Sequence, residues 1–118
     1  MDVSEMEKKR RYPRVTFSAL TELLPRGEDA LIQAYPFSAG YGGLGVYTLK
    51  AIPIGQEVTA RIFLNLGNGR KVTDSISSIV KWCDLIGGMY KLGIEFKNIN
   101  PNEHWPLFAY LKASARWQ

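Results

Sequence analysis

Two arginines near the N-terminus have a spacing that suits the binding of an anion. The segment Arg10-Arg11-Tyr12-Pro13-Arg14 places Arg10 and Arg14 four residues apart, with Arg11 beside the first. A guanidinium can donate two hydrogen bonds to a phosphate or to guanine O6 and N7, and its flat face can stack on a purine. Five of the fifteen cationic side chains lie between positions 8 and 14. Such a block is typical of a docking arm for phosphate, nucleic acid or an acidic surface, or of a solubilising tail.

A second candidate feature is a run dense in glycine. The segment from Ser38 to Val46 contains Gly40, Gly43 and two further glycines. Glycine lets the backbone adopt a positive φ, and it lets a ligand approach main-chain N–H groups closely. The alternative interpretation is a plain turn with a β-bulge.

Residues suited to catalysis or metal binding are sparse. The single cysteine, Cys83, and the single histidine, His104, have no partners nearby in the sequence for a zinc site. The chain has no GxSxG nucleophile elbow and no Walker phosphate loop. We therefore predict that the protein is not an enzyme, has no metal site and needs no cofactor. Cys83 and His104 are expected to be structural, and acidic residues such as Asp74 to be solvated.

Short apolar segments separated by turn residues must position these features. β-Branched and aromatic residues at this spacing are typical of a sandwich or barrel. Gly67-Asn68-Gly69 predicts a tight hairpin because these residues tolerate a positive φ. Further turns are predicted at Ile54-Gly55-Gln56 and Ile86-Gly87-Gly88. The predicted strands are Val15 to Leu24, Asp29 to Phe37, Gly43 to Leu49, Glu57 to Leu66, Lys71 to Cys83 and Met89 to Phe96.

The C-terminal segment changes to a helical period. Leu107, Phe108, Leu111 and Ala115 repeat at the spacing of one helix face. We expect a helix from about Asn102 that covers the barrel. The three tryptophans, Trp82, Trp105 and Trp117, are expected to be core or helix-packing residues because large apolar side chains are usually buried.

The chain is long enough for one domain with one core. We assign residues 1–14 to a basic N-terminal arm and residues 15–118 to a single domain. No stretch approaches the roughly 20 apolar residues of a membrane span, and the N-terminus lacks a signal-peptide pattern. The expected location is therefore the cytoplasm, without membrane insertion.

Taken together, these features resemble the PilZ domain family. The likeness rests on the RxxxR arm at Arg10 to Arg14, the turn at Ser38 to Gly43, the segment Gly93-Ile94-Glu95-Phe96 and the C-terminal helix. In the second family motif, [D/N]xSxxG, Ser38 stands where Asp or Asn is usual and Gly40 where Ser is usual, whereas Gly43 matches. The resemblance implies an all-β fold with one C-terminal α-helix, built as a six-stranded antiparallel β-barrel.

The resemblance also implies a ligand. Many PilZ domains are cytoplasmic bacterial receptors for cyclic di-GMP. By this likeness, the expected ligand-binding residues are Arg10, Arg11, Arg14, Ser38, Gly40 and Gly43. The arm would close over the nucleotide and change the surface offered to an effector protein.

Two alternatives to a nucleotide receptor remain open. One is a PilZ-like adaptor that no longer binds the nucleotide and acts only by protein contact, which the changes at Ser38 and Gly40 favour. The other is a small barrel that binds single-stranded nucleic acid through its arm and exposed aromatic residues. Nucleic acid is the less favoured partner because acidic residues such as Glu22, Glu28 and Asp29 interrupt any basic stripe.

Overall fold

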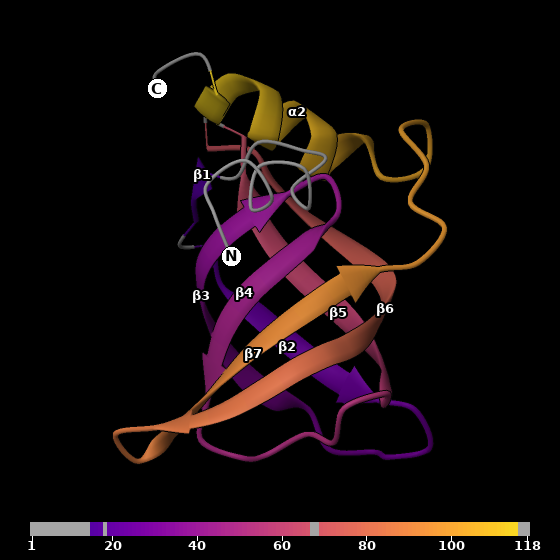
Figure 1. Ribbon diagram of the computed structural model, residues 1–118. Helices are drawn as coiled ribbons and strands as arrows, with labels where there is room; N and C mark the ends of the chain where they lie inside the picture. Colours follow the sequence, from indigo (N-terminus) through magenta and orange to yellow (C-terminus); the bar gives the residue numbers. More distant parts are fainter. Residues whose placement is uncertain (1–14, 18, 67–68, 116–118) are drawn as a thin grey trace, which may run out of the picture.

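The computed structural model describes residues 15–17, 19–66 and 69–115. Within these ranges the chain forms strands that pair in the antiparallel sense and one helix near the C-terminal end (Figure 1). The elements are β1 (Val15–Thr16), β2 (Thr21–Pro25), β3 (Ile32–Gly40), β4 (Gly43–Thr48), β5 (Glu57–Asn65), β6 (Lys71–Ile86), β7 (Met89–Phe96) and α2 (Trp105–Ala115).

The strands of the described residues close into a barrel. Six of them form a ring in the order β3, β2, β5, β6, β7 and β4, and β4 pairs again with β3. Their inward side chains make one apolar core, to which β5 contributes Val58, Ala60, Ile62 and Leu64 at alternate positions. The predicted six-stranded antiparallel barrel with one C-terminal helix is confirmed.

The segment predicted as a single first strand is divided between β1 and β2. Both lie along the edge of β3 that faces away from β4, with Val15 opposite Ala39 and Thr21 opposite Ala34. Between them the chain shifts towards β5, because the Leu20 carbonyl accepts a hydrogen bond of 2.9 Å from the Phe63 N–H. The division leaves β1 beside the C-terminal half of β3.

The predicted turns lie between the strands as expected. β5 and β6 form a hairpin in which Asn65 is opposite Lys71, and Gly69 has a φ of 73°. Residues 67–68 of this turn lie outside the described residues. Gly55 (φ 90°), Gly87 (φ 56°) and Gly88 (φ 83°) also adopt positive φ values. At these positions glycine avoids the strain that a Cβ would create.

Helix α2 lies across one end of the barrel (Figure 1). It begins at Trp105, three residues after the expected start, because the Asn100 side chain holds the preceding segment in a turn. Its Oδ1 accepts hydrogen bonds from the N–H groups of Asn102 (2.8 Å) and Glu103 (3.4 Å). Pro106 is therefore the second helical residue, where a missing N–H costs little. Leu107 and Leu111 face the core.

Two aromatic contacts join the helix to the barrel. The rings of Phe108 and Tyr41 lie 4.7 Å apart between centroids, and Tyr110 meets the edge of Phe17 at 5.2 Å. Tyr41 belongs to the turn between β3 and β4, and Phe17 directly follows β1. The helix thus packs on the turn inside the glycine-dense run and on Phe17, which follows the strand that pairs with the start of that run.

A buried polar contact fixes the start of the helix. Asp74, on β6, and His104 are only 5% and 6% exposed, and His104 Nδ1 lies 2.8 Å from Asp74 Oδ1. Asp74 Oδ2 also accepts a hydrogen bond of 3.3 Å from the Leu107 N–H, in the first turn of α2. The structure agrees with a structural role for His104, whereas the prediction that Asp74 is solvated is wrong.

The exposure of the tryptophans differs from the prediction. Trp82 and Trp105 are 39% and 44% exposed, so neither is a core residue. Trp82 lies on an outward position of β6, and Trp105 carries the Arg70 guanidinium over its ring at 5.6 Å. Trp117 lies outside the described residues. Cys83 is half-buried against the core.

Candidate functional site

The three predicted residues of the second motif lie close together where β3 meets β4, although Gly40 and Gly43 are buried. Ser38 and Gly40 are alternate residues of β3, and Gly43 opens β4 directly opposite Gly40. Ala39, between Ser38 and Gly40, and Leu44, after Gly43, are fully buried in the core. Ser38 is half-buried and brings the one side chain hydroxyl of the three to this surface.

The glycines of this run serve close packing rather than unusual backbone angles. Among the described residues, the positive φ values lie elsewhere, so the expectation of a positive φ in this run is wrong. A Cβ on Gly43 would lie 2.0 Å from the Ile94 carbonyl oxygen, on the neighbouring strand β7. Glycine at position 43 therefore allows β4 and β7 to approach each other closely.

A β-bulge in β3 brings two side chains over a second glycine. The register between β3 and β4 shifts between Pro36 and Ser38. A Cβ on Gly45 would lie 2.5 Å from Phe37 Cζ and 2.8 Å from Ser38 Oγ. Phe37 and Ser38 therefore share the outer surface above Gly45.

Lys91 and Tyr47 complete this part of the outer surface. The ammonium of Lys91 lies 4.9 Å from the centroid of the Phe37 ring and 6.0 Å from that of Tyr47. The two rings are 5.0 Å apart. We call Phe37, Tyr47 and Lys91 the outer aromatic cluster. Strand alternation places Tyr47 and Lys91 on one face from the sequence alone, but the bulge that adds Phe37 has no such signal.

The predicted arginines Arg10, Arg11 and Arg14 lie outside the described residues. The chain that follows them is described from Val15, which pairs with Ala39, and Thr16 pairs with Ser38. The N-terminal segment is therefore joined to the barrel at the strand next to the second motif.

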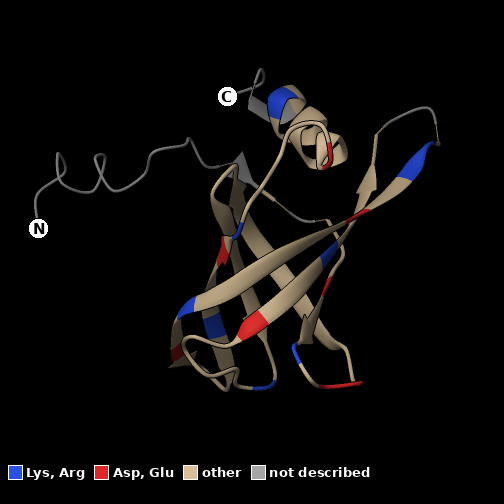
Figure 2. Ribbon diagram, turned by 90° about the vertical axis from the view of Figure 1, so that its right-hand side faces the viewer, with Lys and Arg blue, Asp and Glu red and all other residues tan. Residues whose placement is uncertain are grey.

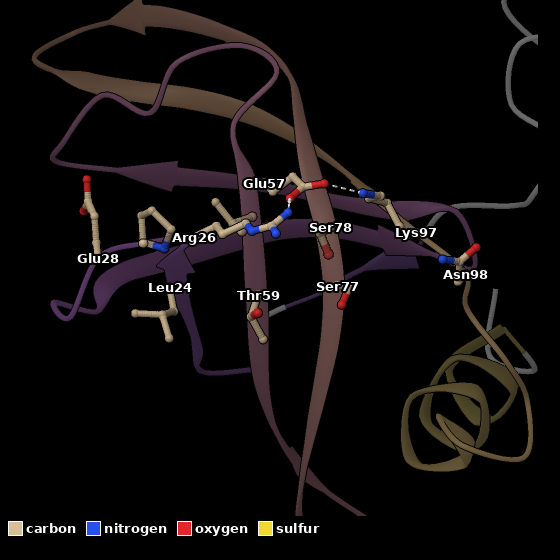
Figure 3. Close-up of a pocket in the computed structure, with 12 residues that line it drawn as sticks. Leu24, Arg26, Glu28, Glu57, Thr59, Ser77, Ser78, Lys97 and Asn98 are labelled. Carbon is tan, nitrogen blue, oxygen red and sulfur yellow. Dashed lines mark hydrogen bonds and ion pairs between the residues drawn. The ribbon is translucent and has the colours of Figure 1, made fainter.

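An open groove of about 380 Å³ lies elsewhere on the barrel (Figure 3). It is lined by the end of β2 and its following turn, by β5 and β6, and by Lys97 and Asn98. At its rim Glu57 accepts a hydrogen bond of 2.6 Å from Lys97 Nζ and forms an ion pair with Arg26. The carboxylate thus joins the turn after β2 to the segment after β7.

These two partners change the titration of Glu57. Hydrogen bonds from Lys97 and from Arg26 lower the pKa of the Glu57 carboxyl from 4.5 to about 2. A lowered pKa in the folded state stabilises the fold above the unfolded value, and this contribution disappears as the pH falls from 4.5 towards 2. Of the predicted site residues that the structure describes, Ser38, Gly40 and Gly43, none lines this groove.

We expect Glu57→Gln to make the free energy of unfolding depend less on pH below about 4.5. The wild-type free energy of unfolding should fall between pH 4.5 and pH 2 more steeply than that of the variant. Urea unfolding at a series of pH values and low ionic strength measures both slopes. Because the pair is exposed, roughly 1 M salt should reduce the difference. If the free energy of unfolding fell equally steeply with pH in wild type and variant at low salt, the stabilising role assigned to the Glu57 carboxylate would be wrong.

The described residues contain no group of three or more side chains that could hold a metal ion. No described helix has the length and apolar character needed to cross a membrane. Acidic and basic residues are interspersed over the described barrel, without a continuous stripe of one sign (Figure 2). This distribution does not favour a nucleic-acid track on the barrel itself.

Comparison with known proteins identifies similar structures but no similar sequences. No family model matches the chain, and no curated protein matches it. The PilZ domain of YcgR from Escherichia coli, solved with cyclic di-GMP, superposes with a TM-score of 0.67 at 18% identity, covering 92% of each chain.

Two further structures superpose on the barrel. The Bacillus subtilis inhibitor of motility, MotI/DgrA, has a TM-score of 0.71 at 14% identity, over 88% of this chain and 51% of its own. The chain therefore spans about half of that protein. The PilZ domain of CeSA from a cellulose-synthesizing bacterium has a TM-score of 0.58 at 11% identity, over 89% of this chain and 97% of its own. The fold of this chain is therefore that of the PilZ domains, as its sequence features predict.

Proposed function

We propose that the protein is a receptor for cyclic di-GMP and acts as a non-catalytic module in bacterial second-messenger signalling. The observation that carries the proposal is the pairing of β1 with the Ser38–Ala39 segment. This pairing joins the arginine-bearing segment to the barrel next to the second motif. A fold shared with a YcgR domain that was solved with cyclic di-GMP supports the same ligand.

In this proposal the ligand is held from two sides. Arg10 and Arg14 donate to the phosphates and to the guanine edges, and Arg11 adds positive charge. The Ser38 hydroxyl contributes a hydrogen bond from the barrel side, next to Gly40 and Gly43 of the same motif. Closure of the arm changes the surface that is offered to an effector protein.

Isothermal titration with cyclic di-GMP tests the proposal. Wild type should bind, and Arg10→Ala and Arg14→Ala should each lower the affinity by roughly 10- to 100-fold, because each loses a bidentate contact. Arg70→Ala is the matched control, since Arg70 is an exposed arginine beside Trp105 and not in either motif. A flat titration of wild type would refute the proposal.

A second candidate function is an adaptor that acts by protein contact alone. It is favoured by Gly40, which has no side chain where the family motif has a serine hydroxyl. The double variant Ser38→Asp, Gly40→Ser separates the two candidates in the same titration. Binding that appears only in the double variant supports the adaptor, whereas low-micromolar binding by wild type excludes it.

A further inference from the structure

Strand β6 continues past the end of β7 and has an open edge there (Figure 1). β5 pairs with residues 71–79 of β6, whereas β7 pairs only with residues 78–86. The last main-chain hydrogen bond on the β7 side runs from the Lys97 N–H to the Ser77 carbonyl, at 2.7 Å. Within the described chain, residues 71–76 therefore have a strand on one side only. We call the unpaired side of residues 71–76 the open edge of β6.

The main-chain groups of Thr73 and Ser75 lie on the open edge. Hydrogen-bonding groups alternate between the two sides of a strand, and the Ser77 carbonyl points to the β7 side. The N–H and C=O groups of Ser75 and Thr73 therefore point to that side too, and none of the described residues bonds to them. Because buried main-chain groups almost always have a partner, these groups face solvent, as the exposed side chains of both residues do.

Little protects the open edge from another strand. Proteins commonly block an exposed edge with a proline, a β-bulge or an inward-pointing charge. Residues 71–76 contain no proline, and their pairing with β5 has no register shift. The inward carboxylate of Asp74 is held by His104 and by the Leu107 N–H. Such an edge suits strand addition, in which an extended peptide bonds to the main chain.

An exposed tryptophan and an exposed arginine border the open edge. His104 contacts Asp74, which lies between Thr73 and Ser75, and Trp105 follows His104 directly. Trp105 is 44% exposed, and the Arg70 guanidinium lies 5.6 Å from the centroid of its ring. Tryptophan and arginine are the residue types that most often dominate the binding energy of protein interfaces.

The charges at the two ends of the open edge favour an acidic partner. Arg70 and Lys71 lie at its start, and neither belongs to an ion pair among the described residues. Beyond its other end, Lys97 and Arg26 share the single carboxylate of Glu57. A second copy of the chain, paired antiparallel along this edge, would bring the cations at one end against those at the other. An acidic segment of a different protein would meet complementary charge.

We propose that the open edge of β6 is a docking site for an acidic, extended segment of a partner protein, which adds to the barrel as a strand antiparallel to β6. The segment bonds to the main chain of Thr73 and Ser75, and its outward acidic side chains lie near Lys71 and Arg70. Trp105 contacts an apolar side chain of the segment. The site does not rest on nucleotide binding, because β6 pairs with neither β3 nor β4, the strands that carry the second motif.

A short synthetic peptide of alternating glutamate and valine, with blocked ends, is the probe. Titrated into the full chain without cyclic di-GMP, it should bind with a Kd of roughly 100 μM. In NMR spectra of the labelled protein, the amide signals of Thr73 and Ser75 should shift, and their hydrogen exchange should slow. A peptide of alternating lysine and valine should bind at least roughly tenfold more weakly, because its charges oppose Arg70 and Lys71.

Thr73→Pro and Thr73→Ala are a matched pair of variants. Proline removes the N–H on the open edge but no bond to β5, so it should weaken peptide binding roughly tenfold or more. Alanine keeps the N–H and should stay within about twofold of wild type. If Thr73→Pro does not fold, peptides N-methylated at alternate residues replace it. Methylation of the N–H groups that face β6 should abolish binding to wild type, and methylation of the other set should not.

The outcomes decide both the site and its occupant. Loss of binding with Thr73→Pro or with the first methylated peptide, together with protected Thr73 and Ser75 amides, supports the proposal. No binding of the glutamate peptide at about 1 mM, or equal binding by both methylated peptides, refutes it. Self-association in sedimentation that Thr73→Pro abolishes would assign the edge to a second copy and overturn the acidic partner. A flat cyclic di-GMP titration would refute the receptor function alone, since the peptide experiment contains no nucleotide.

Discussion

Replacing Gly43 with alanine is expected to lower the free energy of unfolding by about 3 kcal/mol. The added methyl group would lie 2.0 Å from the Ile94 carbonyl oxygen and 3.2 Å from Glu95 Cα. These are main-chain atoms, so they move only if the paired strands β4 and β7 separate. Urea unfolding followed by circular dichroism gives the difference in stability.

Gly45→Ala is the matched control for this prediction. A methyl group at Gly45 meets side-chain atoms, Phe37 Cζ and Ser38 Oγ, which can rotate away. We expect a smaller loss, about 1 kcal/mol. A loss of about 1 kcal/mol or less in Gly43→Ala would show that the β4–β7 contact tolerates an added methyl group, and would contradict the packing role assigned to Gly43.

Replacing Asp74 with alanine should also lower the free energy of unfolding by about 3 kcal/mol. The change leaves two buried groups without a partner, namely His104 Nδ1 and the Leu107 N–H. The first turn of α2 would lose its contact with β6, so the helix should loosen before the barrel unfolds. Hydrogen exchange at helix amides, read beside global unfolding, measures both effects.

Ser75→Ala is the control for Asp74→Ala. Ser75 follows Asp74 on the same strand but is exposed, so its replacement should change stability by less than about 0.5 kcal/mol. A similarly small effect in Asp74→Ala would show that the buried contact does not hold the helix. His104→Ala should reproduce part of the loss, since it removes one of the two partners of the carboxylate.

Much of the barrel could be predicted because its signals are local. Alternation in Val58, Ala60, Ile62 and Leu64 identifies the inward face of β5, and glycines mark the hairpin that follows. The resemblance to PilZ domains rested on short motifs spread over the chain. The similar folds of YcgR and CeSA confirm it at the level of the fold.

The features that could not be predicted depend on distant contacts. The first strand is divided because Leu20 bonds to Phe63, more than forty residues away. Asp74 is buried because His104, thirty residues later, pairs with it. The reason for glycine at position 43 is the backbone of β7, which the local sequence does not reveal. For the candidate site, Ser38 stays a prediction from the sequence, and the bulge that brings Phe37 beside it has no local sequence signal.

The aromatic contacts of helix α2 affect how shortened forms of the chain should be interpreted. Phe108 supports the turn that carries Tyr41, and Tyr110 supports Phe17 just after β1. A version that ends before Trp105 would remove a support from the turn inside the second motif and from the segment after β1, although no helix residue belongs to that motif. Weak ligand binding by such a fragment would reflect the loss of these helix contacts and not the loss of a motif residue. Ligand affinity should therefore be measured on the complete barrel with its helix.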